Sequence, residues 1–115
     1  SRCEITAADD FVSLFADRFY FGCEADDPTN AWAFQRDNNP FGAELKTLFG
    51  SDIGHFDVKE MAGVLPEAYE LVEEGKIDHD AFRRFVFENP VRFWGEVNPD
   101  FFAGTTVAAE AKKLL

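Results

Sequence analysis

The chain has 115 residues, 46% hydrophobic and 29% charged, a composition typical of one globular domain and not of a disordered segment. Its 22 acidic and 11 basic residues give a formal net charge of −11, which argues against nucleic acid or an anionic membrane as a partner. Two cysteines outside any C-x-x-C pair, with no signal peptide and no long apolar run, predict reduced thiols in a cytoplasmic protein.

The first two elements expected along the chain are a helix and a strand. Thr6, with Asp9 at the third helical position, begins a capped amphipathic helix over about 7–17. The short apolar run 19–23 is then followed by several acidic residues and Pro28. This pattern is typical of a strand buried on both faces, as in parallel sheets.

A second strand is predicted about one crossover unit after the first. Asp27 or Thr29 can cap a helical segment that carries Trp32 and gives way to turn-forming residues at 37–40. Residues 47–51 form the next short apolar run. The order strand, helix, strand indicates a parallel α/β sheet.

The next helix is predicted from a capping box. Asp57 serves as its N-cap, Glu60 completes the box, and Gly75 ends the helix. Pro66 falls inside the apolar repeat, so the helix is either kinked there or begins its main run there after a short first turn. The sequence leaves both possibilities open.

Three further helical segments are expected after this helix. Asp78 caps one of them, Asn89 and Pro90 restart a turn of helix that Gly95 closes, and Thr106 caps an alanine-rich last helix. The predicted fold class is therefore α/β and predominantly helical, with two short parallel strands and about five helices. Because two parallel strands alone do not make a stable sheet, other copies of the chain or a larger parent fold must supply more strands.

Candidate functional residues lie where the two strands end, since the carboxyl ends of parallel strands face one crevice. Asp52 follows the second strand, and with His55 it could bind a divalent metal or act as a general base. Cys23 and Glu24 end the first strand and could contact substrate. Spacing alone favours a simpler interpretation, in which Asp52 caps a turn, His55 is solvated and Cys23 is an inert buried thiol.

Two stretches carry a resemblance to a known family. Residues 49–58, with the sequence FGSDIGHFDV, resemble the final barrel strand and loop of the amidohydrolase superfamily, and residues 85–95, FVFENPVRFWG, are similar to its closing helix. Residues 18–24 would then resemble the penultimate strand. The resemblance implies that 1–115 is a single partial domain, comprising the last two βα units and the C-terminal helices of a (β/α)8 barrel. The start at Ser1 without an initiator methionine likewise predicts a partial chain.

The resemblance also implies a chemistry. Asp52 matches the family's aspartate that binds a catalytic metal, usually zinc or manganese, and accepts a proton from the metal-bound water. His55, Cys23 and Glu24 then become expected substrate contacts. The family's histidine ligands on other strands have no counterpart here. We therefore expect the parent protein to be a metal-dependent hydrolase or a related decarboxylase, and the isolated chain to be inactive and to hold no metal.

A non-enzymatic interpretation stays open beside this one. In it, the chain is a small α/β domain that completes its sheet by self-association and serves as a structural or protein-interaction module. Both interpretations predict a homo-oligomer, because strand edges and the helix faces that carry Phe11, Phe15, Phe82 and Phe85 would otherwise face water.

Overall fold

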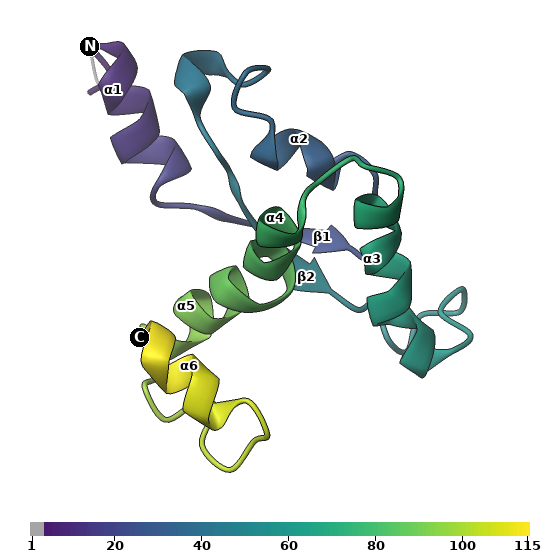
Figure 1. Cartoon of the computed structure of the whole chain (residues 1–115). Coiled ribbons are helices and arrows are strands. Elements are labelled where there is room, and N and C mark those ends of the chain that lie inside the picture. The colour runs from purple at the N-terminus through teal and green to yellow at the C-terminus, as the bar shows by residue number, and fades with distance from the viewer. Residues whose placement is uncertain (1–3) are drawn as a thin grey trace.

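The computed structural model describes residues 4–115, in which helices pack against a small parallel sheet (Figure 1). The elements of the N-terminal half are α1 (Ala8–Phe11), η1 (Val12–Ala16), β1 (Tyr20–Glu24), α2 (Asn30–Phe34), η2 (Pro40–Gly42) and β2 (Lys46–Gly50). Those of the C-terminal half are η3 (Met61–Gly63), α3 (Val64–Glu73), α4 (His79–Arg83), η4 (Arg84–Glu88), α5 (Asn89–Gly95) and α6 (Ala108–Leu114). In this part of the chain, no helix is long and apolar enough to cross a membrane.

The two strands confirm the predicted α/β class. β1 and β2 pair in parallel, with Tyr20 opposite Lys46 at one end and Glu24 opposite Gly50 at the other. Each strand lies within one residue of its predicted position. Within residues 4–115 the sheet has these two strands, so both of its outer edges lack a strand partner there.

The sheet is covered on one face. Cys23 and Phe49 are register partners on that face, and the Phe49 ring meets the fully buried Phe85 ring edge-on at 5.7 Å. The core cluster beneath them consists of Ala25, Val64, Ala68 and Phe85. On the opposite face Gly22 and Glu24 are exposed. Burial of the first strand on both faces was therefore a wrong prediction, because Gly22 and Glu24 are exposed on the second face, although Tyr20 at its start contacts the Phe93 ring of α5 at 5.2 Å.

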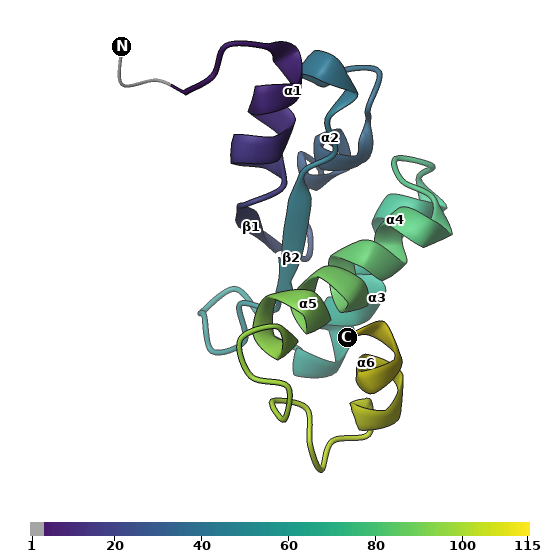
Figure 2. The same ribbon diagram turned by 90° about the vertical axis from the view of Figure 1, so that its left-hand side faces the viewer.

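A continuous helical rod formed by α4, η4 and α5 passes over β2, as Figure 2 shows. The Asp78 side chain accepts a hydrogen bond from the Ala81 N–H at 2.7 Å, which confirms the predicted cap. The predicted helical segment from Asn89 to Gly95 is confirmed as α5, but the expected break before it is absent, because the π-helical turn η4 carries the helix through: the Asn89 N–H bonds to the Arg84 carbonyl, five residues back. Pro90, the second residue of α5, has no N–H to donate, and it lies where the hydrogen-bond pattern of the rod changes from π-helical to α-helical.

Helix α3 begins later than predicted. Glu60, and not Asp57, caps the preceding turn η3, its carboxylate accepting the Ala62 N–H at 3.3 Å. Pro66 lies in the first turn of α3, where a missing N–H costs little. The helix ends at Gly75 as predicted, and the left-handed backbone of this glycine (φ 68°) is the usual conformation after a helix C-terminus.

The last helix also differs from its prediction at the N-terminus. α6 begins at Ala108 after Val107, whose side chain makes no capping hydrogen bond, so Thr106 is not the cap. Before α6, the Trp94 and Phe101 rings stack at 5.1 Å between centroids and hold the intervening loop against α5.

Candidate functional site

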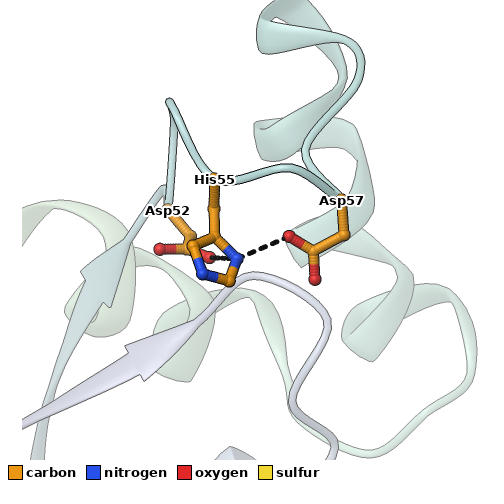
Figure 3. A group of neighbouring side chains, drawn as sticks. All are labelled: Asp52, His55 and Asp57. Carbon is orange, nitrogen blue, oxygen red and sulfur yellow. Dashed lines mark hydrogen bonds and ion pairs between the residues drawn. The ribbon is translucent and has the colours of Figure 1, made fainter.

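The loop after β2 brings three potential metal ligands together, Asp52, His55 and Asp57 (Figure 3). His55 Nδ1 lies 2.8 Å from Asp57 Oδ1 and 3.2 Å from Asp52 Oδ2. A tight turn makes this possible, because the His55 N–H bonds to the Asp52 carbonyl at 3.0 Å. The residues of this turn therefore place one imidazole between two carboxylates.

The backbone at Asp52 is in a strained conformation. Its φ of 50° lies in the left-handed region, which costs a residue with a Cβ about 1–2 kcal/mol, although aspartate is among the residues that tolerate it best. Gly54 in the same turn has a φ of 105°, which favours glycine. Strain of this kind is frequent at functional loops.

The charges in this group stabilise one another. The hydrogen bond that His55 donates to Asp57, followed by the negative charges of Asp52 and Asp57, raises the pKa of His55 above its ordinary value of 6.5. The same hydrogen bond from His55 lowers the pKa of Asp57. All three side chains are exposed, so solvent screens the ion pairs and their contribution to folding is small.

The donor set and its spacing fit a divalent metal. Zinc bonds of about 2.0–2.1 Å in tetrahedral geometry place neighbouring ligand atoms about 3.3 Å apart. The 3.2 Å between Asp52 Oδ2 and His55 Nδ1 is close to this value, and the ligand atoms of all three residues lie within 4.8 Å of one another. Imidazole with carboxylate suits zinc, and manganese accepts carboxylate readily. Binding requires His55 to lose its proton.

Asp52 and Asp57 also line a hollow of about 320 Å³ beside the loop. Glu24, at the end of β1, lies on the same hollow, which joins two of the predicted site residues in one place. In all, seven carboxylate side chains and a single lysine, Lys59, line it. The volume is at the lower end of the range for small-molecule pockets.

Cys23 lies near Asp52 along a second hollow, but its thiol is poorly suited to chemistry. Burial, followed by the negative charge of Asp27, raises the pKa of Cys23 to about 12, and the thiol donates a hydrogen bond to Asp27 Oδ2 at 3.5 Å. The sulfur packs against the core cluster below the sheet. At neutral pH Cys23 can therefore contact a substrate only as a neutral thiol.

Asp57 is the residue of this group that the sequence prediction missed as a ligand. The spacing D-x-x-H-x-D at 52–57 was the available signal, but a capping role explained Asp57 equally well. Comparisons of the chain with protein-family models, curated proteins and solved structures find no significant match.

Proposed function

We propose that the chain is part of a metal-dependent hydrolase of the amidohydrolase type, in which Asp52 is a metal ligand and the proton acceptor. The observation that supports this most is the position of Asp52, directly after a parallel strand and 3.2 Å from a second potential ligand, His55. Catalytic groups of parallel α/β folds gather at this end of the strands. The resemblance of residues 49–58 to the last barrel strand and loop of that family points to the same residue.

Each residue has a distinct role in this proposal. Asp52 holds the metal and takes a proton on its free carboxylate oxygen. His55 contributes a nitrogen ligand or a contact to substrate. Without metal, Asp57 orients the imidazole through the 2.8 Å hydrogen bond to Nδ1; a metal bound at Nδ1 would replace that hydrogen bond. A bound zinc or manganese ion would lower the pKa of a water molecule and so supply the nucleophile. Glu24 and the neutral Cys23 thiol would contact substrate from the neighbouring strand.

Further strands complete the site in the parent protein that we propose. A (β/α)8 barrel presents ligands from several strands, whereas Asp52, His55 and Asp57 all come from one loop. The unpaired sheet edges within residues 4–115 are where a barrel would add strands. We therefore propose that the isolated chain holds no resident metal, binds added metal ions only weakly and does not turn over substrate.

Paramagnetic broadening by Mn²⁺ tests the metal site without requiring activity. Substoichiometric Mn²⁺ should broaden the amide resonances of residues 52–57 first, and Asp52→Asn should abolish this preference. Asp37→Asn, at an exposed carboxylate in a remote turn, is the matched control and should leave the preference intact. Equal broadening over the whole acidic surface would contradict the proposed site.

The second candidate function is the self-associating structural or interaction module. The observation that favours it is a group of exposed aromatic rings near the unpaired sheet edge: Phe15, Phe19 and Phe41, of which Phe41 is 61% exposed. Sedimentation of the chain as a dimer or larger oligomer, without localised Mn²⁺ broadening, would favour the module. A monomer at all concentrations would contradict the association that both candidates predict.

A further inference from the structure

A second charged hollow lies at the opposite end of the sheet. Tyr20 and Lys46, the first residues of β1 and β2, line it, whereas Asp52 follows the last residue of β2. A five-residue strand spans about 13 Å, so the two sites are separated by more than the length of β2. The hollow has a volume of about 670 Å³ and is independent of the proposed metal centre.

Cationic side chains dominate the lining of this hollow. These side chains are those of Arg18, Arg36, Lys46, Arg84 and Arg92. They come from segments that are far apart in the sequence. Three carboxylates, Asp17, Glu44 and Glu96, also line it, which leaves an excess of two positive charges. The chain has 11 basic residues and a net charge of −11, so this gathering of five cations contrasts with the rest of the surface.

Two of the cations, Arg36 and Arg84, share one carboxylate, that of Glu44. Glu44 Oε2 accepts hydrogen bonds from Arg36 at 3.2 Å. Arg84 Nε lies 2.8 Å from Glu44 Oε1 as an ion pair, although the N–H is not aligned for a hydrogen bond. The Glu44 carboxylate is thus shared between two guanidinium groups, so these three side chains together carry one net positive charge.

The other three cations have no carboxylate partner within 4.0 Å among residues 4–115. Arg18 Nε donates to the Ser13 carbonyl at 3.2 Å, and Lys46 Nζ donates to the Asp17 carbonyl at 2.6 Å while lying 5.2 Å from the centre of the Tyr20 ring. Arg92 forms no ion pair in this part of the chain. Backbone carbonyls therefore position two of these cations and leave their remaining N–H groups available to a ligand.

We propose that this hollow binds a small anion carrying two or more phosphate or carboxylate groups. Arginine side chains bind both groups through paired N–H donors, and their convergence on one hollow provides several such donors at once. The net charge of −11 does not prevent binding, because at physiological ionic strength charges beyond about 8 Å are largely screened. The nearby cations therefore decide the local potential.

Calorimetric titration of the chain in metal-free buffer at an ionic strength of about 0.15 M, where the distant negative charges are screened, tests this site, with inorganic pyrophosphate and citrate as probes. The two probes distinguish a phosphate from a carboxylate preference, and binding of either supports the site. Arg92→Gln should weaken binding about tenfold, as expected for the loss of one charge-assisted contact. Glu96→Gln removes a lining carboxylate and should tighten binding. Both positions are exposed, so folding should be retained.

Lys112→Gln is the matched control, since it removes the same charge from an exposed site outside the hollow. It should change the affinity less than twofold. In parallel, NMR of the unmodified chain should show probe-induced shifts centred on the arginine side chains of the hollow. Absence of binding by both probes, or equal weakening by Arg92→Gln and Lys112→Gln, would overturn the proposal.

Discussion

Replacing Asn89 by alanine tests the link between the helical rod and strand β2, on whose position Asp52 depends. Asn89 is 7% exposed, and its Nδ2 donates a hydrogen bond of 2.9 Å to the Thr47 carbonyl, 42 residues away. The substitution leaves this buried carbonyl without that partner, which costs about 1–3 kcal/mol. Unfolding entropy of about 2.1 cal/mol/K per residue converts a 2 kcal/mol loss into a decrease in Tm of about 8 °C.

Urea unfolding followed by circular dichroism measures the change, with the m-value as a check that the unfolded state is unaffected. Asn38→Ala is the control, because this amide is exposed and its loss should change the free energy of unfolding by less than about 0.5 kcal/mol. Asn89→Asp should also be destabilising, since a carboxylate would face the carbonyl at the same place. A loss below about 0.5 kcal/mol for Asn89→Ala would refute the reasoning.

Three further measurements probe the core and the site. Phe85→Ala, at a fully buried ring, should cost about 3–5 kcal/mol in the same unfolding assay, and a loss below 1 kcal/mol would contradict the assigned core. At pH 8, Cys23 should react with iodoacetamide about 10³ times more slowly than a thiol with the ordinary pKa of 9.0, and Asp27→Asn should accelerate the reaction; mass spectrometry of the modified peptide measures both. NMR titration of the metal-free chain should place the pKa of His55 above 6.5, and Asp57→Asn should lower it. Because the pKa is raised on folding, the stabilisation from His55 is complete below pH 6.5 and disappears as the pH rises through the raised value; an unchanged pKa in Asp57→Asn would contradict the pairing.

Local signals in the sequence predicted much of the fold. The cap at Asp78 and the stop at Gly75 were located correctly because each depends on a few neighbouring residues. The two strands were also found, since short apolar runs between turn-forming residues have few other interpretations. Asp52 and His55 were identified as neighbours from their spacing, and the structure places them 3.2 Å apart.

The wrong predictions share a different cause. Asp57 has the chemistry of an N-cap, but its carboxylate bonds to His55 and the helix starts beyond Glu60. Asn89 and Pro90 have the chemistry of a helix break, but the amide of Asn89 bonds to β2 and the π-helical turn absorbs the proline. In both cases another hydrogen bond competes with the local preference: the partner of Asn89 lies 42 residues away and is not identified by the sequence, whereas the partner of Asp57 is His55, two residues before it.

The π-helical turn η4 also determines how the chain tolerates changes in length. A π turn contains one residue more than an α turn, and inserting a residue into an α-helix would otherwise rotate everything beyond it by about 100°. In the rod from His79 to Gly95 the turn at 84–88 absorbs this residue. Deleting one residue there would therefore restore α-helical hydrogen bonding and leave α5 facing the same way, whereas a deletion inside α5 would rotate the rest of that helix away from its neighbours.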